Sequence, residues 1–316
     1  MKNANDFVKH RFLELDGIRI FYREAGPLHA PIMLLPHGYP CSSYEFRNLM
    51  PLLADSWRLI APDFPGCGYS DTPDDFAYDF DGYADFLDRF TDRLEVARFA
   101  LYLHDFGSQI GLRLAIRRPE RISALIIQNG DIYEDTLGPK YAPLQEYFRN
   151  PSPEGRAKLG EAVSEDGYRE EFLNDVRPEL AERIPPDLWK LHWSLTTPRR
   201  REIAIDVIAG LRDNLNWFPR YQAYLREHQP PALIAWGRRM ATCPRPRHAP
   251  TCATCRKPSF TYSTAAIGCL KPTSRRPSTS YGIFSRVLSR LPDDATIARL
   301  RGKSLRTTIG SLALSD

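Results

Sequence analysis

No apolar run in this sequence approaches the roughly 18 to 20 residues that a membrane-spanning helix needs. The first seven residues also lack the apolar core of a secretory signal peptide. These two absences argue against a membrane span and against secretion. We therefore expect a cytoplasmic protein with no membrane partner.

Acidic residues are scarce in the last quarter of the chain. From Arg238 onward there are 15 Lys and Arg but only 3 Asp and Glu. The preceding residues hold 28 Lys and Arg and 36 Asp and Glu. The net charge of +4 therefore conceals two compositions that join near Gly237. Such an asymmetry can mark a nucleic-acid-binding tail, but no binding motif accompanies it and aromatic residues are sparse there. We expect no nucleic-acid partner.

Cysteine is also unevenly placed, since four of the six cysteines lie beyond Gly237, at positions 243, 252, 255 and 269. A four-cysteine zinc site usually contains two close pairs of ligands. Only Cys252 and Cys255 form such a pair. The spacing therefore argues against a metal site.

The rest of the chain shows a regular alternation of strand and helix patterns. At 316 residues and 42% hydrophobic content, the chain can bury a sizeable core. Asp16-Gly17 separates two alternating segments and predicts a β-hairpin. Buried strands are predicted over 31–35, 57–63, 99–103, 122–128 and 232–237, and helices over 42–53, 80–94 and 217–228. This order predicts an α/β fold in which helices cover both faces of a mostly parallel sheet.

Helical or irregular segments without strands fill the chain from 131 to 216. An insertion of this length between two sheet strands is most simply a helical lid. We therefore predict a core over 1–130, a helical cap over 131–216, a return to the core over 217–237, and an off-pattern, poorly ordered basic tail over 238–316.

An abrupt change from strand to helix occurs at His104-Asp-Phe-Gly107, between the strand that ends at Leu103 and a helical pattern that reaches Ile116. Such a turn holds one side chain above the sheet, beside the free N–H groups of the helix N-terminus. Here that residue is Asp105. An aspartate N-cap of an ordinary turn would give the same local pattern, so the turn alone does not decide between a structural and a catalytic role.

Three motifs together resemble the α/β-hydrolase superfamily, in the aspartate-nucleophile branch of epoxide hydrolases and haloalkane dehalogenases. They are His37-Gly-Tyr-Pro40, Asp63-Phe-Pro-Gly-Cys-Gly-Tyr-Ser70 and His104-Asp-Phe-Gly107, in this order, and the likeness covers residues 12–237. The resemblance implies that Asp105 is a nucleophile that forms a covalent ester with a small organic substrate. It also implies that the N–H groups of Tyr39 and Phe106 form an oxyanion hole, that His37 and Gly38 support this loop, and that no cofactor or metal is needed.

Residues around the nucleophile bear on the substrate. In the family, haloalkane dehalogenases usually hold the halide with a Trp after the nucleophile, and here that position is Phe106, which has no indole N–H. We therefore favour an epoxide-type substrate, with a haloalkane as the alternative. Candidates for the substrate pocket are His104, Tyr141, Tyr147, Trp189 and Trp193. Candidates for a lid tyrosine that donates a proton are Tyr141, Tyr147 and Tyr168.

The resemblance fails beyond Gly237, where the family has an acid, a strand and finally a catalytic histidine. The only histidine there is His248, which comes too early, and Asp131 is the alternative candidate for the acid. With suitable codons, one shifted reading frame restores all three parts: Asp-Gly-Tyr-Leu-Pro after Arg238, Glu-Leu-His-Leu-Phe-Asp from Pro258, and Gly-Gly-His-Trp from Thr264. We therefore hypothesise a frameshift near residue 238 that impairs turnover. A non-catalytic relic of the fold is the remaining alternative.

Overall fold

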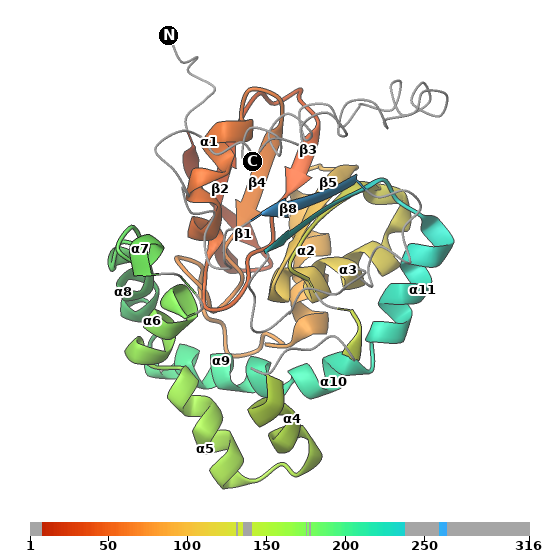
Figure 1. Ribbon diagram of the computed structural model, residues 1–316. Helices are drawn as coiled ribbons and strands as arrows, with labels where there is room; N and C mark the ends of the chain where they lie inside the picture. The colour runs from red at the N-terminus through yellow and green to blue at the C-terminus, as the bar shows by residue number, and fades with distance from the viewer. Residues whose placement is uncertain are drawn as a thin grey trace.

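The computed structural model of the chain describes residues 8–130, 132–134, 141–174, 176, 178–237 and 259–263. Its centre is an eight-stranded sheet in the order β1-β2-β4-β3-β5-β6-β7-β8 (Figure 1). The strands are β1 (Lys9–Leu15), β2 (Ile18–Ala25), β3 (Ile32–Leu34), β4 (Arg58–Pro62), β5 (Phe99–His104), β6 (Ile122–Gln128), β7 (Ala232–Gly237) and β8 (Ser259–Ser263). β1, β2 and β4 pair antiparallel and all other neighbours pair parallel. The predicted α/β fold is confirmed.

The predicted hairpin joins β1 to β2, with Leu15 opposite Ile18. Its two turn residues both have positive φ, 53° for Asp16 and 78° for Gly17. This is the backbone that a two-residue hairpin turn requires, and Asp-Gly is one of the sequences that adopts it most readily.

Side chains of the central strands alternate between two apolar layers. Leu101 and Leu103 of β5 pack into the cluster that contains helices α2 (Phe80–Arg93), α3 (Phe106–Arg117) and α11 (Phe218–His228). Ala100 and Tyr102 of the same strand pack on the opposite face, against helix α1 (Met50–Leu53) and the 3₁₀ helix η2 (Ser43–Asn48). Burial of both faces explains why the central strands are continuously apolar rather than alternating with polar residues.

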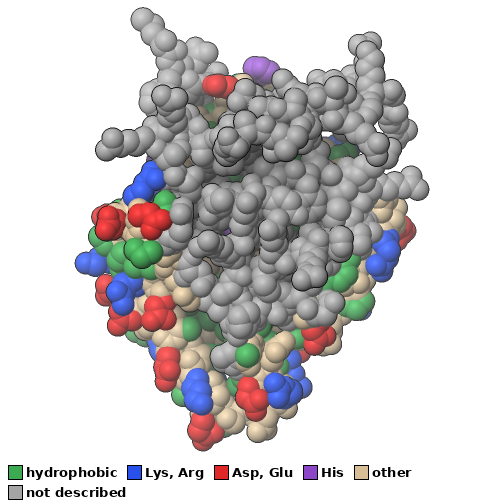
Figure 2. Space-filling model, in the orientation of Figure 1, with side chains coloured by type: hydrophobic (Ala, Val, Ile, Leu, Met, Phe, Trp, Pro, Cys, Tyr) green, Lys and Arg blue, Asp and Glu red, His purple; other side chains and the backbone are tan. Residues whose placement is uncertain are grey.

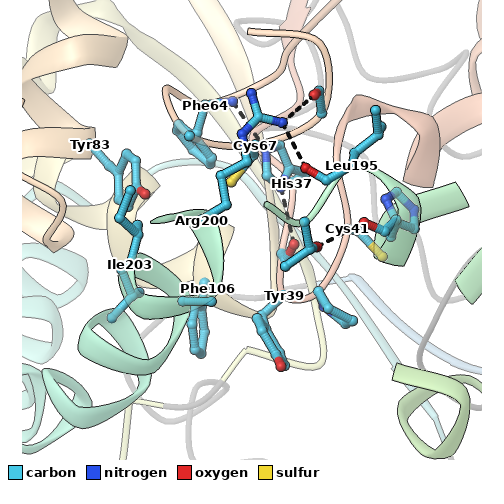
Figure 3. Close-up of a pocket in the computed structure, with 18 of the residues that line it drawn as sticks. His37, Tyr39, Cys41, Phe64, Cys67, Tyr83, Phe106, Leu195, Arg200 and Ile203 are labelled. Carbon is cyan, nitrogen blue, oxygen red and sulfur yellow. Dashed lines mark hydrogen bonds between the residues drawn. The ribbon is translucent and has the colours of Figure 1, made fainter. Parts of the chain in front are cut away.

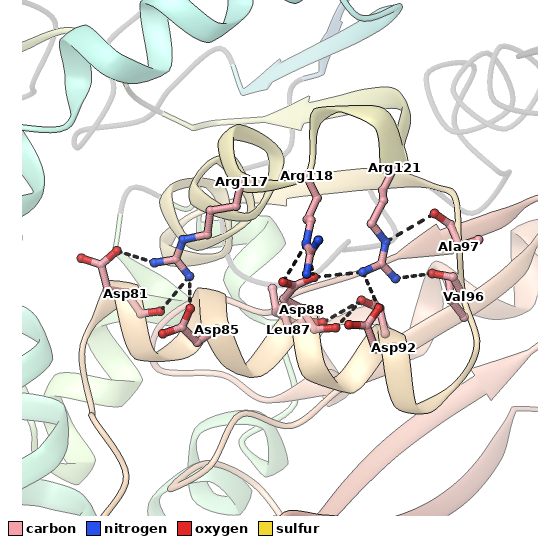
Figure 4. A network of polar contacts seen from close by, with 11 residues as sticks. Asp81, Asp85, Leu87, Asp88, Asp92, Val96, Ala97, Arg117, Arg118 and Arg121 are labelled. Atoms are coloured by element: carbon pink, nitrogen blue, oxygen red, sulfur yellow. Dashed lines mark hydrogen bonds and ion pairs between the residues drawn. The ribbon is translucent and has the colours of Figure 1, made fainter.

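Helix α2 has an apolar face and an acidic face. Phe86 and Phe90 are fully buried against the sheet, whereas aspartates at 81, 85, 88 and 92 face arginines of α3 and of the short helix η3 (Pro119–Arg121) (Figure 4). Arg121 Nη1 lies 2.9 Å from Asp88 Oδ1 and 2.7 Å from Asp92 Oδ1. The exposed pairs of such a row add little to stability, at most about 1 kcal/mol each, but together they orient α2 along α3.

Helices α4 to α10 form a cap on one side of the sheet (Figure 1). They are α4 (Ala142–Arg149), α5 (Pro153–Ala162), α6 (Glu165–Leu173), α7 (Pro178–Ala181), α8 (Asp187–Ser194), α9 (Pro198–Ala209) and α10 (Leu211–Leu215). The cap has its own apolar cluster, in which Phe172, Leu188 and Ile205 are buried. Within the described residues, no helix is long and apolar enough to cross a bilayer.

One predicted helix differs from its expected form. The stretch from Ser42 to Leu53 is divided into the 3₁₀ helix η2 and the short α1. Ser42 is the N-cap of η2, and its Oγ accepts from the Tyr44 N–H at 3.3 Å. Glu45 stands three residues after Ser42, the spacing of a capping box, but its carboxylate accepts from the Gly38 N–H. A contact made by tertiary structure therefore takes the place of the local one.

Most of the predicted tail lies outside the described residues, including the cysteines beyond Gly237 and His248. The candidate acid Asp131 also lies outside them. Only Ser259–Ser263 of this part are described, as β8, which pairs parallel with β7. On the described part of the face shown in Figure 2, acidic and basic side chains are intermixed over the cap helices.

Candidate active site

Asp105 occupies the sharp bend between β5 and α3. Its backbone has φ 49° and ψ −133°, a conformation that residues other than glycine rarely adopt. Such strain costs about 1–3 kcal/mol and persists only where the surroundings fix it. Here the neighbouring backbone leaves no room for side chains, since a Cβ on Gly107 would lie 2.3 Å from the Pro36 carbonyl oxygen. The bend is thus held by packing on both sides.

Leu103, which is larger than the residue that this kind of bend usually carries, fits for a similar reason. The nearest atom to a Cβ placed on Gly111 is Leu103 Cδ2, at 2.6 Å. Leu103 is 1% exposed and occupies the space that a side chain at position 111 would need. The absence of a side chain at Gly111 therefore accommodates the leucine.

Two backbone N–H groups converge on a single oxygen of Asp105. Tyr39 N lies 2.8 Å and Phe106 N lies 2.7 Å from Asp105 Oδ1. These are the two N–H groups expected to form an oxyanion hole. The loop after β3 approaches so closely that a Cβ on Gly38 would lie 2.5 Å from Asp105 Cβ, which requires glycine at position 38.

The charge of Asp105 is set by opposing effects. Burial raises the pKa of the Asp105 carboxyl above its usual value. Nearby His104 and the N–H groups of Tyr39 and Phe106 act against this rise, and Glu45 adds to it. A carboxylate with few stabilising contacts is a better nucleophile than a fully solvated one, provided that it stays ionised.

His37 supports the oxyanion loop through both ring nitrogens. Its Nε2 lies 3.1 Å from the Phe64 N–H, which can only donate, so Nε2 accepts. Its Nδ1 then carries the proton and donates to the Gly38 carbonyl oxygen at 3.0 Å. Burial lowers the pKa of His37, although the negative charge of Asp63 acts to raise it. The ring is therefore neutral near pH 7. Both nitrogens are engaged, as expected of a structural support.

His104 and Glu45 form a buried pair directly behind Asp105. His104 Nδ1 faces Glu45 Oε1, and Glu45 Oε2 accepts from the Gly38 N–H at 2.9 Å. Both side chains are about 4% exposed. The pKa of Glu45 is lowered although burial alone would raise it, because His104 and the Gly38 N–H stabilise the carboxylate. His104 was expected in the pocket but packs behind it.

The second motif, Asp63 to Ser70, shapes one wall of the site through Asp63. Asp63 is completely buried, and its two oxygens accept from the N–H groups of Ser43 and Tyr69, each at 2.8 Å. Gly68 has φ 52°, and a Cβ there would lie 1.9 Å from Asp63 Oδ2. Asp63 therefore organises the loop from Pro65 to Ser70 around its carboxylate.

A pocket lies between this loop, the bend after β5 and the cap, and encloses about 680 Å³ of space, part of it open to solvent (Figure 3). The core side of its lining includes Tyr39 and Phe106, whose rings stack 5.8 Å apart. The cap contributes Tyr168 from α6, His192 from α8 and Arg200 from α9. The lining residues are 37–41, 64, 66–68, 83, 106, 110, 168, 192, 195, 196, 200, 203, 204 and 207.

Several predicted pocket residues do not line it. Trp193 packs edge-on against Tyr168 at 5.7 Å, behind the lining, and Trp189 is buried in the cap cluster. Tyr147 packs beside Phe148 and Tyr141 is the N-cap of α4. Of the three tyrosines considered, only Tyr168 lines the pocket. Its OH lies 3.2 Å from Thr196 Oγ1, and burial raises its pKa to about 12.

Sequence reasoning missed three residues that the structure places at the site: Glu45, His192 and Arg200. Arg200 Nε donates to Thr72 Oγ1 at 2.8 Å, and its Nη1 donates to the carbonyl oxygens of Gly68 at 2.7 Å and Leu195 at 3.1 Å (Figure 3). It joins cap to core at the pocket wall. Burial lowers the pKa of His192 to about 3, so its ring is neutral. No local pattern marks these residues, because each acts through partners distant in the chain.

Comparison with known proteins assigns the fold. The family model for the alpha/beta hydrolase fold matches residues 31–239. An uncharacterized hydrolase of Saccharomyces cerevisiae is 34% identical over 232 residues, which cover 72% of this chain and 80% of that protein. A haloalkane dehalogenase variant from Bradyrhizobium elkanii superimposes with a TM-score of 0.70 at 24% identity, over 93% of this chain and 100% of the other.

Shorter matches connect the chain to enzymes of named activity. A cis-3-alkyl-4-alkyloxetan-2-one decarboxylase of Shewanella oneidensis is 40% identical over 124 residues, 38% of each protein. A haloalkane dehalogenase of Mycolicibacterium paratuberculosis is 35% identical over 115 residues, 36% of this chain and 38% of that enzyme. Because the family model and the yeast hydrolase both cover most of the chain, the protein belongs to the α/β-hydrolase fold family.

Proposed function

We propose that this protein is a hydrolase in which the Asp105 carboxylate displaces a leaving group from a saturated carbon of a small organic substrate. The observation that carries the proposal is the pair of N–H groups, from Tyr39 and Phe106, on one oxygen of Asp105. An N-cap needs only a contact to its own helix. The second N–H comes from a different loop, which a purely structural N-cap would not require.

On this proposal each oxygen of the carboxylate has its own role. Oδ1 is held by the two N–H groups, so Oδ2 is the oxygen that attacks carbon. The new C–O bond forms as the bond to the leaving group breaks, and the leaving group departs with the electron pair. Oδ1 then becomes the carbonyl oxygen of the ester. When water adds to this ester, negative charge develops on Oδ1, where the same N–H groups stabilise it.

A carbon–halogen bond is the first candidate for the bond that breaks. The named activity of several partial relatives and the similar fold of the Bradyrhizobium enzyme support it. A departing halide needs hydrogen-bond donors. Among the described lining residues no tryptophan is present, and Thr196 Oγ1 donates its proton to the His192 carbonyl oxygen at 2.8 Å. A halide would therefore take its hydrogen bond from the Tyr168 hydroxyl, which would turn away from Thr196.

An epoxide is the second candidate, and Tyr168 favours it. Opening an epoxide leaves an alkoxide that must take up a proton. Tyr168 lines the pocket with its ring 5.8 Å from that of Tyr39, and its hydroxyl lies 3.2 Å from Thr196 Oγ1. Its raised pKa keeps it protonated near neutral pH, so it can donate a proton to the opened ring.

Release of the ester requires a base that activates water. Both nitrogens of His37 are engaged with backbone groups, and His104 faces Glu45. Neither is free to take a proton from water at Asp105. The family's base follows the last strand, in the part of the chain that we propose to be frameshifted. On this proposal the attack step survives in the present chain, and hydrolysis of the ester is slow.

The experiment is intact-mass spectrometry of the full chain after incubation with 1-bromobutane or with 1,2-epoxybutane. The first would leave a butyl ester and the second a hydroxybutyl ester, which differ in mass, and peptide mapping would place either on Asp105. If Tyr168 protonates the epoxide, Tyr168→Phe reduces the second adduct by about tenfold or more. The first adduct should fall much less, because a departing halide accepts a hydrogen bond but takes up no proton. Tyr147→Phe, outside the pocket lining, is the matched control. No adduct on Asp105 from either reagent, with wild-type fold retained, would refute the proposal.

A further inference from the structure

Three contacts and two peptide bonds close a ring around Asp105. Asp105 Oδ1 accepts from the Tyr39 N–H, and the adjacent Gly38 N–H donates to Glu45 Oε2. Glu45 Oε1 faces His104 Nδ1, and His104 is bonded through the chain to Asp105. The ring joins three elements: η2, the loop after β3, and the end of β5.

We propose that Glu45 is a positioning residue of the Asp105 site, which fixes the oxyanion loop at Gly38 and the turn at His104 with its two carboxylate oxygens. This inference rests on the proposed function and deepens it. Glu45 does not touch the reacting atoms. It determines where the Tyr39 N–H lies relative to Asp105 Oδ1, since Gly38 and Tyr39 are adjacent.

Burial supports a functional role for this carboxylate. Glu45 is 4% exposed and sits where no solvent can satisfy its charge. A buried carboxylate is costly unless its contacts compensate for the lost hydration. An apolar residue in the same space would avoid this cost, but it would leave the Gly38 N–H without an acceptor and the loop free to shift. A displacement of the donors by about 1 Å can slow a reaction by two orders of magnitude.

The pair also sets the charge around Asp105. The titratable groups that face it are His104 from β5, Glu45 from η2, and His37 and Tyr39 from the loop after β3. Among these, His104 is the main influence that opposes the burial of Asp105, and Glu45 acts in the other direction. Glu45 repels the Asp105 carboxylate, but it also holds His104 in place, and His104 stabilises that carboxylate. Loss of His104 would leave two carboxylates in one buried cluster.

Three variants test the proposal. Glu45→Ala removes both contacts, and we expect the rate of Asp105 ester formation at pH 7 to fall by about tenfold or more. Glu45→Gln keeps one oxygen for the Gly38 N–H and should recover most of this loss. Glu24→Gln is the matched control, because Glu24 is a buried carboxylate that pairs with Arg11 and Arg58, away from the site. It should affect stability without changing the rate.

The pH dependence gives a readout that a purely structural pair would not alter. In His104→Gln the acid limb of ester formation should move to higher pH, because the charge that opposes the burial of Asp105 is gone. An acid limb that stays at its wild-type position in His104→Gln, or a folded Glu45→Ala that reacts at the wild-type rate, would overturn the proposal.

A second measurement does not depend on reactivity or on the alanine variant folding. The amide resonances of Gly38 and Tyr39 report the loop directly by NMR. They should keep nearly their wild-type positions in Glu24→Gln, and in His104→Gln the 13C titration of the Asp105 carboxyl should move to higher pH. If wild type forms no adduct, the proposed function fails and these spectra still decide the positioning role. Unchanged Asp105 titration in His104→Gln would overturn it.

Discussion

The backbone N–H of Tyr39 donates to Asp105 Oδ1 over 2.8 Å, across 66 positions of sequence. This contact joins the loop after β3 to the bend after β5, two strands that are neighbours in the sheet. It brings an acceptor and a donor together before any substrate binds, which is the arrangement that catalysis of ester formation and breakdown needs. Variants of the residues on both sides of this contact test its role.

Asp105→Asn should abolish ester formation, because an amide oxygen is a far weaker nucleophile than a carboxylate. Asparagine tolerates positive φ, so the bend should persist. Intact mass after incubation with either alkylating reagent measures the loss. Asp81→Asn, a change on the surface-facing side of α2, should react like wild type, and an adduct that persists in Asp105→Asn would place the nucleophile elsewhere.

Asp105→Asn should also raise the free energy of unfolding, by an amount that depends on pH. The pKa of Asp105 is raised in the folded protein, so folding favours the protonated form, and stability falls as pH rises from the unfolded-state pKa through the folded one. Asp105→Asn removes this penalty. We expect a gain in the free energy of unfolding at pH 7 that disappears below about pH 3.8, the carboxyl's ordinary pKa. Urea unfolding at both pH values measures it, and an equal gain at both would contradict the explanation.

Gly38→Ala should destabilise the protein and slow ester formation. The added Cβ would lie 2.5 Å from Asp105 Cβ, so the loop must move away from the bend. Forced overpacking of this kind costs about 1–3 kcal/mol, measurable by urea unfolding. The control is Gly210→Ala, where φ is −67° and the nearest atom to the new Cβ is 3.3 Å away. That variant should be within about 0.5 kcal/mol of wild type.

Arg200→Met should loosen the cap. The side chain loses its contacts to the loop that contains Gly68 and to the Leu195 carbonyl oxygen, each worth about 0.5–1.5 kcal/mol net. Hydrogen exchange should quicken in α9 and in the loop from Pro65 to Ser70, with β5 unaffected. Arg199→Met is the control, because the Arg199 side chain is 52% exposed and its contacts, to Asp74 at 4.0 Å and to the Tyr78 ring at 5.9 Å, are long. Equal exchange in both variants would show that Arg200 does not hold the cap.

Lowering the pH should destabilise the protein through His37. Burial lowers the pKa of His37, so the folded state favours the neutral ring, and stability is lost as pH falls from 6.5 toward the folded pKa. In His37→Gln the slope of stability against pH below 6.5 should become shallower. Unfolding free energies between pH 7 and pH 5 measure this, and an unchanged slope would assign the effect to other groups.

Gene resequencing tests the frameshift hypothesis. We expect a single-base insertion or deletion near the codon for Arg238. Once it is corrected, the restored frame encodes the Gly-His loop. A repaired chain should then release the ester and turn over. A confirmed reading frame together with turnover by the present chain would eliminate the hypothesis.

The sequence by itself determined the α/β fold and the position of the bend at Asp105. Strand and helix patterns, the Asp-Gly hairpin and the change at Leu103 are local, because they depend on side-chain periodicity and backbone preferences over a few residues. The three motifs near His37, Asp63 and Asp105 likewise mark where strands end in turns.

Only the tertiary structure decided how those turns meet. Glu45 has the spacing from Ser42 of a capping box, but it binds Gly38 and faces His104. His104 lies behind the pocket, Tyr168 alone among three candidate tyrosines lines it, and Arg200 reaches it from the cap. These outcomes depend on which backbone donors and acceptors the sheet order brings within about 3 Å of one another. Sequence spacing carries no record of those distances.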